Sequence, residues 1–588
     1  MVIAPQTDVF LLKVPLEIND INQLTFADAT AQYNYFSSLP KKEYDNFTYQ
    51  RKDGVIRIPE LIDDIIEYNY VMYRNTAYSD KWFYGFITDM EYLNDNVTAV
   101  SIKTDVWQSW MFNLTFKPVF IDREHTNDDR VGLNTLPEGM ELGEIVVNQN
   151  TTDFGASVDF AQNKYWIVID VSMVENEGDG QTLAYSWTGT SQKLHPLVNG
   201  MPSGLYHLIV GQYTAGGDTK DIQMVLDVYD NAGLGDAIEN IYIVPKELIP
   251  TVHSGFVLTS TNSLHGTPTT KSVDIALPAE STLPSNMNAF DYDFDMYRYL
   301  VDYKPVNNKL YTFPFNYFCI SNNAGVTVPF HYEDFDITNF AFKRIKFRVL
   351  GALCPSGSIK AIPLDYKAQN NELSCLDYGV TGAKYPMLAW TTDSYTNWLT
   401  QNSVNLDFQK EQVLRESITE SISNTIQGAI EGGQSGGIKG GVFGGVTSAV
   451  TSAINASSNL MQQTRSELAQ KKSANITPDQ ARGNINAGDL VWSMKQGKFT
   501  YIPMCIRPEL ARCIDDYFSH YGYKTNRVKV PNITGRRNWN YVRTIGCYIE
   551  GDVPQADLQE IKSMFDRGIT FWHNPETFAD YTQNNDII

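Results

Sequence analysis

The sequence predicts a predominantly β protein of the α+β class, divided into several domains. Short strand-like segments, each bounded by Gly, Pro, Asn or Asp, recur along the chain as far as Leu350. Two helix-like segments lie near the C-terminus, and one long glycine-rich hydrophobic segment precedes them. The length of 588 residues exceeds what one compact core can hold, and it favours roughly three to five domains.

A β-hairpin is the clearest of the strand-like segments. Between Lys81 and Val106 an aromatic run leads into the turn cluster Asn94–Asn96, and alternate residues after this turn share one apolar face. The other predicted strands are Tyr165–Val171, Tyr206–Val210, Ile241–Val244, Leu310–Ile320 and Phe340–Leu350. The recurrence of such strands makes the body of the protein mainly β.

Two helices are predicted from apolar spacing and from end signals. The first begins at Pro508, carries apolar residues at three- to four-residue spacing, and ends at Gly522. The second follows Pro554 and ends at Gly568. Because the strand-like segment Trp539–Glu550 lies between them, we expect the C-terminal region to be an α+β unit.

The composition excludes several classes of protein. Hydrophobic residues make up 43% of the chain and charged residues 19%, so the chain can form real cores and is not disordered as a whole. The net charge of -22 repels phosphates, which argues against stable non-specific nucleic-acid binding. No signal-peptide or spanning-helix pattern is present, so we expect a soluble protein made in the cytosol. The six cysteines lack CxxC spacing and are expected to be small buried apolar residues.

The segment from Leu414 to Leu460 has an unusual four-residue period. Apolar residues recur every four positions, glycine pairs take up the same spacing, and apolar residues then resume. The residues that define this segment are Leu414, Ile418, Ile422, Ile426, Ile430, Gly432, Gly436, Gly440, Val442, Phe443, Gly444, Val446, Val450 and Ile454. Two helical arms with a glycine-rich tip are the simplest interpretation, and a flexible Gly/Ser linker is the alternative. A linker has no reason to keep one face apolar, so the period favours the helical arms.

The energetics of the glycine-rich tip indicate how it behaves. The eight paired glycines oppose a helix in water by about 8 kcal/mol, so a helical tip is not expected to be stable alone in water. Glycine at four-residue spacing lets helices approach closely in lipid. Burial of each Ile or Val side chain contributes about 1.5 to 3 kcal/mol, which favours insertion into a bilayer when several chains act together. We therefore expect a segment that is first hidden and then released.

No catalytic, cofactor-binding or metal-binding site is predicted. The chain has no HExxH motif and no phosphate-binding GxxxxGK[ST] motif, and its eight histidines are scattered. Asp291, Asp293 and Asp295 alternate like the start of a calcium loop, but Met296 stands where that loop needs glycine. An acidic strand edge is the better interpretation. The protein is therefore not expected to be an enzyme.

One stretch of the chain is basic, although the chain as a whole is acidic. It contains no Asp or Glu, and its basic residues are Lys524, Arg527, Lys529, Arg536, Arg537 and Arg543. These side chains either contact passing DNA or form ion pairs with an acidic neighbouring subunit. The second alternative is favoured, because complementary charges commonly fix the register of two subunits.

Several longer blocks carry a resemblance to a known family. At the N-terminal end these blocks are Asn75–Leu93, Asp105–Phe112 and Phe120–His125. At the C-terminal end they are His520–Asn532, Asn540–Asp552 and Asp557–His573. Together they resemble the tail knob, or distal tail tube, proteins of small short-tailed phages with protein-primed DNA replication, the picovirus-like podophages.

The resemblance implies a function in the virion. It implies a homohexameric tube at the distal end of the tail, with β domains similar to the tube domains of long-tailed phage hubs. It also implies hydrophobic loops that plug the lumen and then form a pore in the host cell membrane, through which double-stranded DNA passes without specific binding. The implied partners are further copies of the chain, a lower collar or proximal tail protein, and the host cell membrane. Synthesis in the host cytoplasm is implied as well.

The same resemblance suggests a division into domains. Residues 1–150 form an N-terminal β tube domain, and residues 151–290 an inserted β-rich outer domain. Residues 291–405 and 486–588 form the two parts of a second tube domain, and residues 406–485 form the glycine-rich segment between them. Because tube closure removes exposed strand edges, we also expect strand pairing between subunits around Trp82–Val106.

Two other functions stay open. A receptor-binding adhesin is expected to show fibre repeats or a trimeric stalk pattern, and the sequence has neither. A cell-wall-degrading enzyme of the tail tip needs paired carboxylates that meet only in the fold. The mass in solution distinguishes the three, because a six-fold ring, a trimer and a monomer are their respective expectations.

Overall fold

The chain folds into two compact units, which were identified in a computed structural model. The first unit consists of Met1–Val146, Arg298–Asn316 and Cys505–Ile588, and the second consists of Val147–Tyr297 and Tyr317–Met504. Both units are therefore built from segments that are distant in the sequence. The structure describes residues 6–18, 21–47, 54–75, 79–156, 158, 164–178, 181–187, 197–198, 201–202, 204–210, 220–249, 252–263, 267–278, 290–335, 344–351, 353–355, 357–369, 371–392, 480–483 and 488–588.

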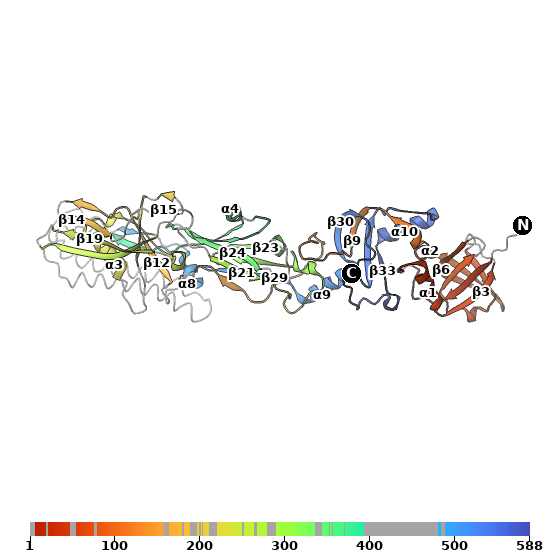
Figure 1. The fold of residues 1–588 in the computed structure, drawn as a ribbon. Coiled ribbons are helices and arrows are strands. Elements are labelled where there is room, and N and C mark those ends of the chain that lie inside the picture. Colours follow the sequence, from red (N-terminus) through yellow and green to blue (C-terminus); the bar gives the residue numbers. More distant parts are fainter. Residues whose placement is uncertain are drawn as a thin grey trace. The chain divides into compact units, whose positions relative to one another are not determined.

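A six-stranded antiparallel sheet forms the N-terminal part of the first unit (Figure 1), in the order β3-β1-β5-β6-β7-β4. Helix α1 (Ala29–Ser38) covers one face, where Phe36 packs with Tyr70 and Tyr84. The other face carries a second cluster that includes Val9 and Val71. The strands are β1 (Thr7–Leu12), β3 (Lys41–Phe47), β4 (Val55–Ile58), β5 (Tyr70–Asn75), β6 (Ser79–Asn94) and β7 (Val97–Thr104).

The predicted hairpin is confirmed as strands β6 and β7. Strand β5 pairs with β6 as far as Phe86, and β4 pairs with β7 from Thr98 to Ser101. Both outer edges of the inner hairpin are thus paired with strands of the same chain. The expected strand pairing between subunits is therefore wrong for this part of the hairpin. Beyond Ile87 the hairpin extends to a tip at residues 88–96, which we call the hairpin tip; its side chains are exposed except that of Met90, which is half-buried.

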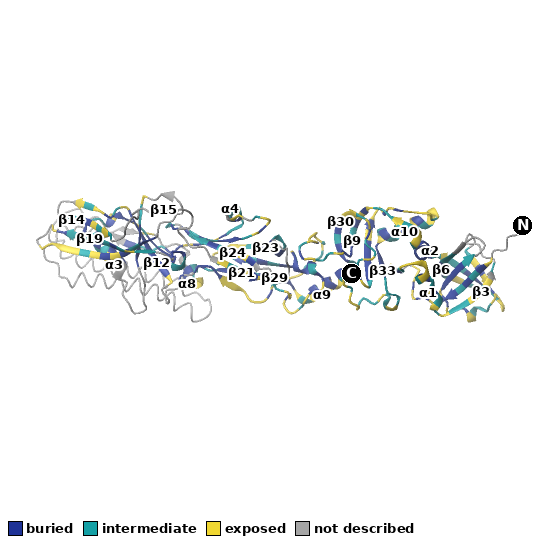
Figure 2. Cartoon of the chain, in the orientation of Figure 1, coloured by how far each residue is buried: buried dark blue, intermediate teal, exposed yellow. Residues whose placement is uncertain are grey.

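A five-stranded sheet in the first unit joins the two ends of the chain, in the order β2-β33-β31-β9-β30. Its strands are β2 (Asn22–Leu24), β9 (Val119–Glu124), β30 (Tyr523–Lys529), β31 (Trp539–Ile545) and β33 (Ile569–Trp572). Helices α2 (Val106–Trp110) and α10 (Gln555–Arg567) cover one face, where Ile121 and Val542 pack with Phe565. All four residues of β33 are buried (Figure 2). A short pair, β8 (Leu114–Phe116) with β32 (Ile549–Gly551), adjoins this core.

Both predicted C-terminal helices are confirmed, with their ends. Helix α9 spans Pro508–Tyr521 and is followed by Gly522 at φ 64°, and α10 is followed by Gly568 at φ 99°. A Cβ atom at residue 522 would lie 2.1 Å from the carbonyl oxygen of Glu124, so this position requires glycine. The predicted strand Trp539–Glu550 is interrupted after Ile545, since residues 546–548 separate β31 from β32.

The described residues of the second unit are mainly in β strands. A seven-stranded sheet has the order β13-β14-β19-β20-β17-β12-β18, and a four-stranded sheet has the order β21-β24-β25-β26. Strand β29 pairs with β11 and β22, and β22 pairs with β23. The strands of the seven-stranded sheet are β12 (Tyr165–Val171), β13 (Asn176–Gly178), β14 (Gln181–Trp187), β17 (Tyr206–Val210), β18 (Ile238–Pro245), β19 (Val252–Asn262) and β20 (Thr269–Pro278). The others are β10 (Ile145–Val147), β11 (Thr152–Phe154), β15 (Leu197–Val198), β16 (Met201–Pro202), β21 (Phe290–Asp295), β22 (Asn316–Ser321), β23 (Thr327–Phe330), β24 (Arg344–Gly351), β25 (Ser358–Pro363), β26 (Val380–Lys384), β27 (Trp390–Thr392), β28 (Gln480–Arg482) and β29 (Phe499–Ile506).

Aromatic side chains fill the core of the second unit. The rings of Phe294 and Tyr501 stack with centroids 4.4 Å apart, and Phe318 packs against Tyr501 at 5.0 Å. Such pairs stabilise a core beyond the area that they bury. Helix α3 contributes Val225 and Tyr229 to the same cluster. The helices among the described residues of this unit are α3 (Lys220–Asn231), α4 (Glu372–Cys375) and α8 (Gly488–Lys495).

The predominantly β fold with few helices agrees with the sequence prediction, and two further details differ. The segment predicted as the strand Leu310–Ile320 begins with a 3-10 turn at Asn308–Tyr311, and its strand starts only at Asn316. Cys513 is exposed, although the cysteines were expected to be buried. In the part of the chain that the structure describes, no helix is long and apolar enough to cross a membrane.

Candidate functional site

Strand β9 organises the basic stretch that the sequence singles out. This strand lies between β30 and β31, so it pairs with both halves of the stretch. Lys524 on β30 and Arg543 on β31 are both cross-strand partners of Arg123 on β9. The N-terminal block around Phe120–His125 and the C-terminal blocks thus lie in one sheet, and Figure 1 shows β9 beside β30.

Two of the basic residues form ion pairs with carboxylates of β9. Lys529 Nζ lies 2.6 Å from Glu124 Oε1, and Arg543 Nε lies 3.6 Å from Asp122 Oδ2. The Glu124 side chain is only 1% exposed, and burial raises its pKa although Lys529 acts in the opposite direction. For these two residues, the acidic partner expected from a neighbouring subunit is supplied within the chain.

The C-terminal residues hold another part of the basic stretch. Arg536 is buried, and its Nη1 donates to the carbonyl oxygen of Asn585 at 3.4 Å. The backbone N–H of Arg537 donates to the carbonyl oxygen of Asp586 at 3.0 Å. Of the six residues, Arg527, Arg537 and Arg543 are exposed, whereas Lys524 and Lys529 are half-buried. The stretch is therefore less cationic at its surface than the sequence suggests.

A buried charge network lies beside the basic stretch and was not predicted from the sequence. The Glu138 carboxylate accepts hydrogen bonds from Arg123 Nη2 and Lys309 Nζ, and from the backbone N–H of Lys524 at 3.0 Å. The side chains of Glu138 and Lys309 are 1% and 2% exposed. Burial lowers the pKa of Lys309 although Glu138 opposes this shift. The network joins segments that are far apart in the sequence, so no local pattern reveals it.

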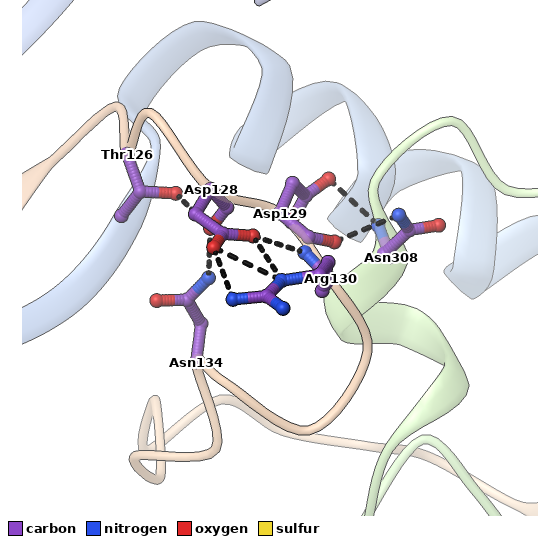
Figure 3. A network of polar contacts seen from close by, with 6 residues as sticks. All are labelled: Thr126, Asp128, Asp129, Arg130, Asn134 and Asn308. Atoms are coloured by element: carbon purple, nitrogen blue, oxygen red, sulfur yellow. Dashed lines mark hydrogen bonds and ion pairs between the residues drawn. The ribbon is translucent and has the colours of Figure 1, made fainter. Parts of the chain in front are cut away.

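A second set of polar contacts fixes the loop that follows β9. Figure 3 shows Asp129 accepting the backbone N–H of Asn308 at 3.1 Å through Oδ2, while its carbonyl oxygen accepts Asn308 Nδ2 at 2.7 Å. The same loop contains an exposed ion pair between Asp128 and Arg130. On helix α9, Asp515 accepts the backbone N–H of Asn307 at 3.0 Å. These contacts fix the loop that follows β9 against helix α9 and residues 307–308.

His125 is held in one tautomer by two backbone groups. Its Nδ1 accepts the backbone N–H of Tyr541 at 2.7 Å, so its Nε2 carries the proton that faces the carbonyl oxygen of Ser519 at 3.1 Å. Burial lowers the pKa of His125 to about 3, and the charge of Arg536 adds to this shift. The imidazole is therefore neutral at physiological pH and serves the fold.

The aspartate run forms a strand edge in the second unit. Strand β21 is the outermost strand of its sheet, and Asp291, Asp293 and Asp295 are exposed on it. Asp291 Oδ1 lies 2.6 Å from Arg348 Nε on the neighbouring strand β24, and this hydrogen bond lowers the pKa of Asp291. The aspartates thus form an acidic edge, as the sequence analysis favoured. Among the described residues, no cluster of His, Cys, Asp or Glu could hold a metal ion.

The glycine-rich segment was singled out from the sequence alone. All of its residues singled out above, from Leu414 to Ile454, lie outside the described residues. The expectation of two helical arms, or of a membrane-inserting loop, remains a prediction from the sequence.

Two family models and several known proteins are similar to this chain. Residues 279–586 match the C-terminal domain of tail knob protein gp9 of Bacillus phage phi29, and residues 5–115 match the N-terminus of caudoviral major tail proteins. The tail knob protein gp9 of Bacillus phage PZA is 26% identical over 98% of both chains. That of Bacillus phage B103 is 27% identical over 96% of this chain and 95% of its own.

A solved structure shows the same fold. The tail knob protein gp12 of bacteriophage C1 has a TM-score of 0.59 and 14% identity, and the match covers 99% of this chain and 100% of that one. The gp9 family match extends over more than half of the chain. The chain therefore belongs to the tail knob proteins of phi29-like, protein-primed short-tailed phages, which are structural proteins of the virion tail and not enzymes.

Proposed function

We propose that this tail knob protein forms a closed hexameric tube at the distal end of the tail, through which double-stranded DNA leaves the virion. The observation that carries the proposal is the match of residues 5–115 to the N-terminus of major tail proteins. These residues include the six-stranded sheet. Closure of a ring protects the outer strands of such sheets from uncontrolled pairing.

The electrostatics support a conduit that does not retain DNA. The chain carries a net charge of -22, so its average field repels the phosphates that move along it. Two residues of the basic stretch, Lys529 and Arg543, are paired with carboxylates of β9. We expect the lumen to be lined by acidic or neutral side chains. A map of the assembled ring in which Lys and Arg dominate the narrowest part would contradict this expectation.

The glycine-rich segment supplies the proposed membrane step. Before infection its six copies plug the lumen and shield one another from water, and on ejection they insert into the host membrane and form a pore. Support comes from the sequence, where the four-residue apolar period continues through the glycine pairs. A lower collar or proximal tail protein is the proposed partner at the other end of the tube.

The mass of the purified full-length protein in solution tests this function. Native mass spectrometry is expected to find six copies. A trimer would favour a receptor-binding adhesin, and a monomer at high concentration would favour a cell-wall-degrading enzyme.

A further inference from the structure

An apolar row lies on the five-stranded sheet, on the face opposite helices α2 and α10. Phe120 on β9 is the cross-strand partner of both Val528 on β30 and Ile545 on β31. Their side chains are 37%, 70% and 58% exposed, respectively. On the opposite face of β9, Val119 and Ile121 are buried in the cluster to which α10 contributes. These three exposed residues, which we call the apolar row, form a patch of the kind that marks interaction sites.

The surroundings of the apolar row are basic. Arg543 lies two residues before Ile545, and its side chain stays 50% exposed although it pairs with Asp122, whose side chain is 22% exposed. Arg527 is exposed directly before Val528, on the other face of the edge strand β30. The chain from Lys524 to Arg543 contains no Asp or Glu. A partner for this surface should therefore combine apolar side chains with negative charge.

The hairpin tip of β6 and β7 has this combination. Tyr92 and Leu93 are 51% and 41% exposed, and Asp89, Glu91 and Asp95 are exposed beside them. The sequence has no Lys or Arg between Trp82 and Ile102. Since residues 82–102 span nearly the whole hairpin, its tip is purely acidic.

The hairpin tip is also ordered before any partner binds. Asn94 pairs with Val97 across the turn, and the backbone N–H of Asn96 donates to Asn94 Oδ1 at 2.9 Å. The hydroxyl of Tyr92 donates to Asp95 Oδ1. An element whose conformation is already fixed loses little entropy when it binds.

We propose that the hairpin tip of one copy docks on the apolar row of the next copy, so that the copies join head to tail. The inference rests on the proposed ring and names its contact surfaces. Two different patches on one chain make a heterologous interface, which closes into a ring when the rotation allows. The occupant is a second copy and not DNA, because the apolar side chains of Tyr92 and Leu93 can cover the row, whereas phosphates would leave its three apolar side chains in water.

Two full-length variants test the contact. In the row variant, Val528→Asp and Ile545→Asp place acidic groups opposite the acidic hairpin tip. In the tip variant, Tyr92→Ser and Leu93→Ser remove the apolar anchors. Each variant alone should need at least about a tenfold higher concentration than the wild type for half-assembly in analytical ultracentrifugation. Leu373→Asp is the matched control, because Leu373 is 70% exposed in the second unit, and it should assemble like the wild type.

An equimolar mixture of the two variants gives the decisive result. The row variant keeps an intact tip and the tip variant keeps an intact row, so the mixture should form dimers that cannot grow further. Unchanged hexamers from either variant, or a mixture that stays monomeric while both variants keep the wild-type circular dichroism spectrum, would overturn the contact. A row variant that assembles normally but loses retention on a DNA duplex would overturn it as well. A wild-type protein that is itself monomeric would instead overturn the proposed ring.

Discussion

Lys529 on β30 places its Nζ atom 2.6 Å from Oε1 of Glu124 on β9. The two residues come from opposite ends of the chain, and they meet because β9 inserts between β30 and β31. Glu124 is almost fully buried, whereas the Lys529 side chain is 39% exposed. The lysine therefore neutralises a carboxylate that has lost most of its water, and the sequence stretch that looks cationic partly serves this purpose.

Removal of the lysine should destabilise the first unit. Lys529→Ala leaves the buried Glu124 carboxylate without its cation, and we expect a loss of about 1 to 3 kcal/mol in the free energy of unfolding at pH 7. Urea denaturation followed by circular dichroism measures the loss. Arg537→Ala is the control, since the Arg537 side chain is exposed, and it should change stability by less than about 0.5 kcal/mol. Equal losses from both variants would show that the Lys529 ion pair contributes nothing.

Glu138 should be the more sensitive position. Glu138→Gln leaves the buried Arg123 and Lys309 without a carboxylate, and the expected loss is about 3 kcal/mol or more. Glu144→Gln is the matched control, because Glu144 pairs with Arg507 at the surface with both side chains more than half exposed. Its cost should be about 0 to 1 kcal/mol. The same denaturation experiment compares the two, and a smaller loss for Glu138→Gln than for its control would refute the network's role.

Burial of His125 should make the protein sensitive to acid. Its pKa is about 3 in the folded state and about 6.5 in the unfolded chain, so between these values the unfolded state binds the extra proton. The contribution of His125 to the free energy of unfolding is complete above pH 6.5. It falls as the pH drops, by up to about 1.4 kcal/mol per pH unit. Burial also lowers the pKa of His573, to about 4, so His573 likewise contributes stability that is lost as the pH falls.

The comparison of variants isolates His125 from other titrating groups. Burial raises the pKa of Asp105 to about 6 in the folded state. Asp105 therefore favours the folded state more as the pH falls, which is opposite to the effect of His125. We therefore compare the wild type with His125→Gln at pH 7 and pH 5, where contributions common to both proteins cancel. The variant should be less stable at pH 7, since Gln does not reproduce both imidazole contacts, but it should lose less stability on acidification. Parallel losses between the two pH values would contradict the assigned pKa shift.

Gly522 is required by both its backbone angle and its neighbour. Alanine there must adopt φ 64° and place a methyl group 2.1 Å from the Glu124 carbonyl oxygen. We expect Gly522→Ala to lower the free energy of unfolding by more than about 2 kcal/mol. Gly546→Ala is the control, because Gly546 has φ 69° but no atom within 4 Å of the added methyl group, and it should cost about 1 to 2 kcal/mol. Thermal unfolding of the two variants separates the steric effect from the backbone effect.

Local signals in the sequence were sufficient to predict where some elements begin and end. The ends of α9 and α10 follow from Pro508, Gly522 and Gly568, because capping and helix initiation depend on neighbouring residues. The apolar run Leu310–Ile320 was misassigned at its start, since aromatic and apolar residues also occur in a buried 3-10 turn.

The candidate site depended on contacts that no local pattern encodes. The basic stretch was visible in the sequence, but its pairing with Asp122 and Glu124 arises only when β9 lies between β30 and β31. Glu138 and Lys309 likewise meet only in the folded unit. Pairing of distant strands is set by the whole fold, so the sequence alone could not reveal which charges remain exposed.

The glycine-rich segment gives the last prediction, on membrane insertion. A peptide of residues 414–460, or purified tails, should release dye from liposomes, because the apolar period can face lipid while the glycines let helices pack closely. Val442→Asp with Val446→Asp should abolish release, since each charge at membrane depth costs about 3 kcal/mol. The pair Val442→Leu and Val446→Leu is the control, because it keeps the segment apolar, and it should release dye like the parent peptide. Equal leakage from the aspartate variant, or full infectivity of phage that carry it, would mean that the segment acts only as a spacer.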